Sequence, residues 1–128
     1  MTSDGGRPLD ESGGLREPPV ASIQELGTAI VVDLVGELDL YNAHLARDAL
    51  LGAAGSSPER LVVDLSKVTF IDSTGLGVLI EARARMTDRG AFRLVAPGVE
   101  TRRALEISGL DRHFIVHDSL EAALAATP

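Results

Sequence analysis

The chain has 128 residues, of which 45% are hydrophobic and only 3% aromatic, and it carries a formal charge of −7. This length suits a single domain with an aliphatic core, and the lack of cysteine excludes disulfides, thiolate metal sites and a cysteine nucleophile. The acidic charge argues against nucleic acid as a partner, and no apolar run approaches the ~20 residues that span a bilayer, so we expect a soluble cytoplasmic protein without membrane insertion.

The N-terminal stretch 1–18 has the composition of an unstructured segment. It contains two Gly-Gly pairs, two prolines and hardly any large apolar side chains. Such a segment cannot bury enough surface to offset the entropy lost on ordering. We therefore predict a disordered tail over residues 1–18, followed by one folded domain over residues 19–126.

The first part of the domain has the pattern of two strands and a helix. Ala29–Val35 is β-branched and nearly continuous, which predicts a buried strand, and Val20–Leu26 is a candidate partner strand across a turn at Gly27-Thr28. Tyr41–Ala54 is predicted to be helical and to end at Gly55. The expected buried side of that helix carries Leu45, Ala49 and Ala53.

Strands and helices continue to alternate to the end of the chain. The predicted strands are Leu61–Leu65, Ala91–Ala96 and Phe114–His117, and the predicted helices are Ser73–Arg89, Val99–Ser108 and a last one that begins after Asp118. Glu121, three residues after Asp118, completes a capping pattern for that last helix. This alternation predicts the α/β class, with a mixed sheet of about four to five strands and about four helices.

The segment 68–80, VTFIDSTGLGVLI, is the most informative one for function. Its polar turn, Asp72 to Gly75, separates an apolar strand from a helix, so Ser73 lies at a helix N-terminus, where unpaired N–H groups favour an anion. Asp, Ser and Thr are also the preferred helix caps, and capping alone is the favoured explanation from spacing. Gly75 and Gly77 lack side chains, so a partner's backbone has room to approach.

The turn Asp72-Ser73-Thr74-Gly75-Leu76 resembles the signature of the STAS family, in particular its bacterial anti-sigma factor antagonists. Gly36-Glu37-Leu38-Asp39 is similar to a second landmark of that family. Ile107-Ser108-Gly109-Leu110 is similar to a third, weaker one. The resemblance extends over about residues 20 to 126, and the three motifs occur in the order that the family has.

The resemblance implies a phosphorylatable binding protein rather than an enzyme, with no cofactor of its own. It places Ser73 at the phosphoacceptor position, Asp72 at the residue that shapes the turn, Thr74 at the alternate hydroxyl and Asp39 at an acidic position used in kinase binding or phosphotransfer. The implied partners are an anti-sigma factor that is also a serine kinase, and a metal-dependent serine phosphatase. The implied contact surface comprises Asp39, Asp72, Ser73, Thr74, Gly75, Leu76, Gly77 and the outer face of the following helix.

Two other functions compete with this interpretation. A STAS domain can instead be an adaptor subunit of a lipid- or anion-transport complex, for which no phosphoserine is needed. A small serine hydrolase is the remote alternative, because two histidines, His113 and His117, lie downstream of Ser73 with Asp111 and Asp118 nearby, so the order Ser, Asp, His of a hydrolase can be drawn. Against it, Ile71 replaces the first glycine of a nucleophile elbow, and the acidic residues and histidines lack metal-ligand spacing.

Overall fold

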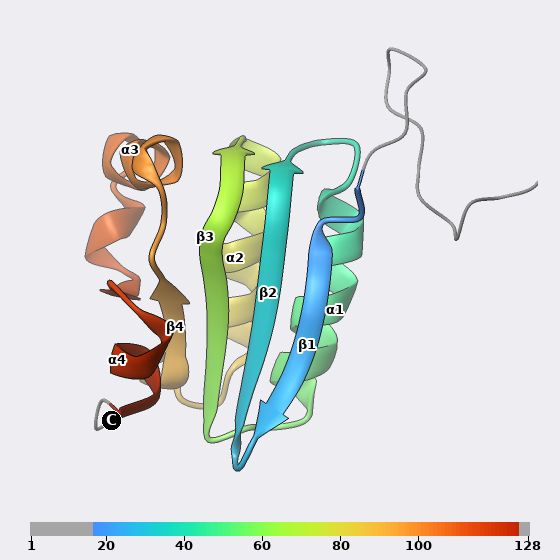
Figure 1. Cartoon of the computed structure of the whole chain (residues 1–128), viewed down its shortest axis with the longest axis vertical. Helices are drawn as coiled ribbons and strands as arrows, with labels where there is room; N and C mark the ends of the chain where they lie inside the picture. Colours follow the sequence, from blue (N-terminus) through green and yellow to red (C-terminus); the bar gives the residue numbers. More distant parts are fainter. Residues whose placement is uncertain (1–16, 126–128) are drawn as a thin grey trace, which may run out of the picture.

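A computed structural model describes residues 17–125 of the chain, in which five strands and four α-helices alternate (Figure 1). The strands are β1 (Val20–Leu26), β2 (Ala29–Leu38), β3 (Arg60–Ile71), β4 (Phe92–Val95) and β5 (Ile115–His117). The α-helices are α1 (Ala43–Gly55), α2 (Ser73–Arg85), α3 (Val99–Ser108) and α4 (Leu120–Ala125), with short 3-10 helices η1 (Arg89–Ala91) and η2 (Leu110–Arg112). The predicted α/β class is confirmed, whereas the predicted tail falls almost entirely outside the described residues.

The strands form one mixed sheet in the order β1-β2-β3-β4-β5. β1 is antiparallel to β2, and all the later neighbours are parallel. Between β2 and β3 the register ends on the pair Leu38 and Ile71, so the two strands finish level with each other. The loop after β2 and the turn before α2 therefore leave the sheet side by side at its carboxyl edge.

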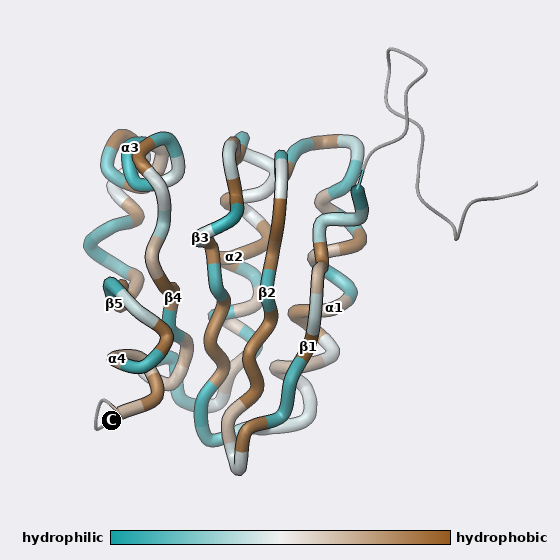
Figure 2. Tube along the Cα trace, viewed as in Figure 1, coloured by the Kyte–Doolittle hydropathy of each residue, from teal (hydrophilic) through white to brown (hydrophobic). Residues whose placement is uncertain are grey.

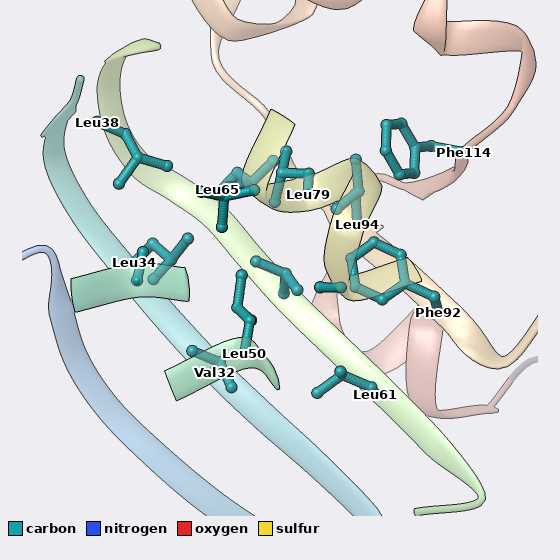
Figure 3. Packing of buried hydrophobic residues seen from close by; sticks show 14 of the residues in the cluster. Val32, Leu34, Leu38, Leu50, Leu61, Leu65, Leu79, Phe92, Leu94 and Phe114 are labelled. Carbon is teal, nitrogen blue, oxygen red and sulfur yellow. The ribbon is translucent and has the colours of Figure 1, made fainter. Parts of the chain in front are cut away.

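The core has two parts because helices cover both faces of the sheet. On one face α1, α2 and α3 pack against the inward side chains of the strands, among them Leu34, Leu65 and Leu94 (Figure 3). α4 lies on the other face (Figure 1), where its Ala123 belongs to a second buried cluster with Val62. Figure 2 shows the resulting brown bands along the central strands.

Of the three residues that the sequence predicted on the buried side of helix α1, Ala53 is buried, whereas Leu45 and Ala49 lie at the edge of the buried side. The buried residues of α1 are Ala43, Ala46, Leu50, Ala53 and Ala54, while Leu45 and Ala49 are only half-buried. The prediction assumed a spacing of four residues from Leu45. An α-helix has 3.6 residues per turn, so residues spaced by four move gradually away from the side that faces the sheet. Leu50, which is fully buried, is the main apolar contact that α1 contributes.

Several element ends also differ from the prediction, among them the end of α2 and the start of the last helix. α2 ends at Arg85 instead of Arg89, because Met86 is extended (φ −70°, ψ 139°) and turns its side chain into the core. The last helix is capped by Ser119, whose Oγ accepts a hydrogen bond from Ala122 N at 3.1 Å. Asp118, the expected cap, lies instead 3.8 Å from the guanidinium of Arg102.

Strand β3 is much longer than the predicted run Leu61–Leu65. Its first half is buried on both sides, which produces the continuous apolar run. Beyond Leu65 only Val68 and Ile71 are buried and the other residues are exposed, so the apolar run stops although the strand continues to Ile71. No helix in residues 17–125 is long and apolar enough to cross a membrane.

Candidate functional site

Asp72 caps helix α2, so Ser73 does not have a capping role. The backbone of Asp72 is extended (φ −100°, ψ −175°), and its Oδ1 accepts a hydrogen bond from Gly75 N at 3.0 Å. Its carbonyl oxygen accepts the first helical bond from Leu76 N at 2.9 Å. Ser73 and Thr74 are the first two residues of the helix, and both are exposed. Capping therefore explains Asp72 but not the two hydroxyl residues that follow it.

The second carboxylate oxygen of Asp72 holds the loop that connects β2 to α1. Asp72 Oδ2 accepts a hydrogen bond from Leu40 N at 3.1 Å, and Asp72 N donates to Leu38 O at 3.1 Å. The bond to Leu40 joins segments that lie 32 residues apart in the sequence. One side chain thus fixes both the turn that carries Ser73 and the loop that carries Asp39.

Asn42 fixes the same loop through its own side chain, and the sequence motifs did not predict this role. The residue is 2% exposed; its Nδ2 donates to Glu37 O at 2.7 Å, and its Oδ1 accepts from Asp39 N at 2.9 Å. Asp39 Oδ1 in turn accepts from Tyr41 N at 3.0 Å. Asn42 lies inside the predicted helix Tyr41–Ala54, whereas α1 begins at Ala43. An Asn near the start of a helical pattern was the available signal, because short polar side chains hold such loops and helix starts.

Gly36, the first residue of the second motif, has a conformational role. Its φ is +75°, a left-handed value that glycine adopts without strain. The β2–β3 register shifts between Gly36 and Glu37, so the strand bends at this point before it enters the loop. The motif therefore sets the direction in which Asp39 leaves the sheet.

The candidate contact residues divide into an inward and an outward group. Gly75 and Leu76 are buried, whereas Gly77 is exposed. A Cβ on Gly75 would lie 2.7 Å from Ile71 Cγ1 and 3.0 Å from Leu38 O. Gly75 thus permits the helix to pack closely on the strand ends, not the approach of a partner as the sequence suggested. A Cβ on Gly77 would meet nothing within 4 Å, so open space does remain at that position.

We use the name Ser73 surface for Asp39, Leu40, Tyr41, Ser73, Thr74 and Gly77. Leu40 is 66% exposed and Tyr41 51% exposed, so the loop presents an aliphatic and an aromatic side chain on the same side as the hydroxyl residues. The segments 36–42 and 71–80 contain three acidic residues and no basic one. The Ser73 surface therefore combines exposed large side chains with acidic and hydroxyl residues, a combination that suits protein binding.

The third motif is explained by the end of helix α3. Gly109 has φ +77° and follows the last helical residue, which is the common left-handed C-cap. The Oγ of Ser108 donates back to Ala104 O at 2.8 Å within the same helix. These contacts terminate a helix and contribute no side chain to the Ser73 surface.

Neither a catalytic triad nor a metal centre is supported. His117, one of the two downstream histidines, contacts the guanidinium of Arg93 through Nε2 at 2.9 Å, and His113 is exposed. Within residues 17–125 no three acidic or histidine side chains are grouped to hold a metal ion.

The fold and the Ser73 turn match one known class of protein. A family model described as the STAS domain matches residues 20–123 of the chain. The chain therefore belongs to the STAS domain family, as the sequence motifs predicted.

Curated relatives with related names extend this result. The anti-sigma-F factor antagonist RsfB of Mycobacterium tuberculosis is 35% identical over 94 residues, which cover 73% of this chain and 77% of RsfB. The antagonist RsfA of the same organism is 33% identical over 110 residues, covering 84% and 86% of the two chains. The crystal structure of an anti-sigma factor antagonist from Mycobacterium paratuberculosis superimposes with a TM-score of 0.76 at 33% identity, covering 80% of this chain and 88% of that one.

Proposed function

We propose that this protein is an anti-sigma factor antagonist that acts as a phosphorylation-controlled binding switch. In its unphosphorylated form the Ser73 surface binds an anti-sigma factor that is also a serine kinase, which frees a sigma factor in the cytoplasm. Phosphorylation of Ser73 ends this complex, and a metal-dependent serine phosphatase restores it. Catalysis belongs to the partners, so the protein itself is not an enzyme.

The observation that carries the proposal is that Asp72, and not Ser73, caps the helix in this turn. Asp72 supplies the cap of α2, and Ser73 remains an exposed hydroxyl residue at the first position of the helix. In the transfer reaction Ser73 Oγ would attack the γ-phosphorus of ATP as ADP leaves, and a base of the kinase would take the hydroxyl proton. An exposed, rigidly placed hydroxyl is what such a kinase requires of its substrate.

The charges around Ser73 support release after phosphorylation. A phosphoserine adds about −1.5 to −2 charges near neutral pH. It would do so beside the carboxylate of Asp72, the residue that precedes Ser73 in the turn. Uncompensated charge in a desolvated interface costs about 2–5 kcal/mol, which corresponds to a loss of affinity of roughly 30-fold or more.

The exposed hydroxyl of Thr74 offers a matched control for the test. Wild type, Ser73→Ala, Ser73→Asp and Thr74→Ala proteins serve as baits in a native lysate, and the captured complexes are then given radiolabelled ATP. We expect an ATP-binding anti-sigma factor on all baits except Ser73→Asp, and label on wild type and Thr74→Ala at Ser73. Equal capture by all four baits, or label at a residue other than Ser73, would contradict the proposal.

The same experiment tests the transport-adaptor alternative. If the protein is an adaptor that does not use phosphoserine, all four baits would capture the same partners, and these would be membrane-transport subunits. That pattern, without ATP-dependent labelling of Ser73, would replace the switch by the adaptor function.

A further inference from the structure

The face of the sheet beneath α4 carries three basic groups from three neighbouring strands. Arg60 begins β3, Arg93 lies in β4 and His117 ends β5. Val62 is the register partner of Arg93, and Val95 that of His117. Side chains two residues apart in a strand share a face, and Val62 and Val95 belong to the cluster that contains Ala123 of α4. All three groups therefore point to the face of the sheet on which α4 lies, and Figure 1 shows the position of that helix.

Both arginines are buried, yet their hydrogen bonds go to uncharged acceptors. Arg60 is 9% exposed and Arg93 is 4% exposed. Arg60 Nη1 donates to Ala123 O and, at 3.4 Å, to Leu124 O at the end of α4. Arg93 Nε donates to Gly90 O at 2.6 Å, and its Nη1 lies 2.9 Å from His117 Nε2.

This cluster has no negative partner in the part of the chain that the structure describes. In residues 17–125 no carboxylate lies within 4 Å of either guanidinium. Asp88 acts on Arg93 and Asp118 on His117 only from longer range. Burial lowers the pKa of Arg93, and the nearby positive charge of Arg60 lowers it further.

Donor groups also remain available at the cluster. Arg93 Nη2 and the Nε and Nη2 atoms of Arg60 have no hydrogen-bond acceptor among residues 17–125. Among residues 17–125, the side-chain N and O atoms that are buried without a hydrogen-bond partner are Asp33 Oδ1 and Thr101 Oγ1. The three arginine nitrogens are not among these atoms, so they reach solvent. Guanidinium N–H groups that reach solvent beside uncompensated charge form the usual donor set for a tetrahedral oxyanion.

We propose that Arg60, Arg93 and His117 form a binding site for a phosphate-sized oxyanion at the edge of α4. The bound anion would neutralise the buried guanidinium groups and take up their remaining N–H donors. The site is separate from the Ser73 surface, because the eleven residue steps from Arg60 to Ile71 along β3 span about 36 Å at ~3.3 Å per residue. The inference therefore does not rest on the proposed switch.

An NMR titration of the full ¹⁵N-labelled chain with inorganic phosphate, replacing chloride at constant ionic strength, tests this site. We expect saturable shifts at the amides of Arg60, Arg93, His117 and Ala123, and a loss of affinity of at least tenfold in Arg93→Gln. Arg103→Gln, on the exposed side of α3, is the control and should bind like wild type. Glycerol phosphate in a parallel titration shows whether a phosphomonoester binds as well as the free ion.

Several results would overturn the proposal. Shifts that do not saturate, shifts that lie elsewhere in the chain, or equal affinity of Arg93→Gln and Arg103→Gln would each exclude the site. The map of shifts in the wild-type protein decides the matter even if Arg93→Gln does not fold.

Discussion

The close packing of Gly75 leads to a prediction that separates structure from partner binding. A methyl group at this position meets Ile71 Cγ1 at 2.7 Å, Leu38 Cγ at 3.2 Å and Leu38 O, a backbone atom, at 3.0 Å. Overpacking of this kind costs about 1–3 kcal/mol. Gly→Ala also gains up to about 1 kcal/mol of helix propensity, and the same gain applies to Gly77→Ala in the same helix, where a methyl group meets nothing within 4 Å.

The difference between the two variants therefore isolates the steric cost. Gly75→Ala should be less stable than Gly77→Ala by about 1–3 kcal/mol, because the propensity gain cancels. With a urea m-value of about 1.5 kcal/mol/M, the two unfolding midpoints should differ by roughly 0.7–2 M. Equal midpoints at equal m-values would refute the reasoning, since α2 would then have room to move away from the strand ends.

Three further changes test other parts of the molecule. Asp72→Ala removes the cap of α2 and the acceptor of Leu40 N, so it should lower the free energy of unfolding in urea by about 1–3 kcal/mol. It should also speed hydrogen exchange at the Leu40 and Gly75 amides, and unchanged exchange would contradict the role of Asp72 in holding both segments. Leu50→Ala should cost about 2–5 kcal/mol, whereas Leu40→Ala on the surface should stay within about 0.5 kcal/mol; similar losses in both would contradict the assigned burial. Burial, then the neighbouring arginines, lower the pKa of His117. The unfolded state therefore binds a proton more readily, so the contribution of His117 to stability is complete above pH ~6.5 and is lost as the pH falls through the lowered folded-state pKa. The stability of wild type relative to His117→Gln should decline from pH 7.5 to 5, and a constant difference would argue against this reasoning.

The sequence predicted the order of the elements and the position of Ser73 because these depend on local patterns. Alternating apolar segments define the α/β class, and the polar break at Asp72 marks where β3 ends and α2 begins. The family motif and the cap lie on consecutive residues, so a short window of sequence contains both. The length of β3 escaped prediction because only its first half is buried on both sides.

What the sequence did not predict depends on tertiary contacts. The capping role was open among Asp72, Ser73 and Thr74, and only the second bond of Asp72, to Leu40 N across 32 residues, shows why an aspartate stands there. Arg60 and Arg93 were not singled out, because arginines mostly lie on protein surfaces. Their burial follows from the packing of α4, which has no local signature in either strand.

The hydrogen bonds of Asp72 also bear on how the proposed switch would work. Its two carboxylate oxygens are held by Gly75 N and Leu40 N, so the carboxylate cannot turn away from a new charge on Ser73 without losing a bond on one side. Each such bond contributes about 0.5–1.5 kcal/mol, and Asn42 holds the same loop a second time. We therefore expect Ser73→Asp to leave the amide spectrum unchanged outside residues 37–42 and 71–77. Shifts that spread through β4 or α3 would mean that the domain itself rearranges, and that release is not decided at the binding surface alone.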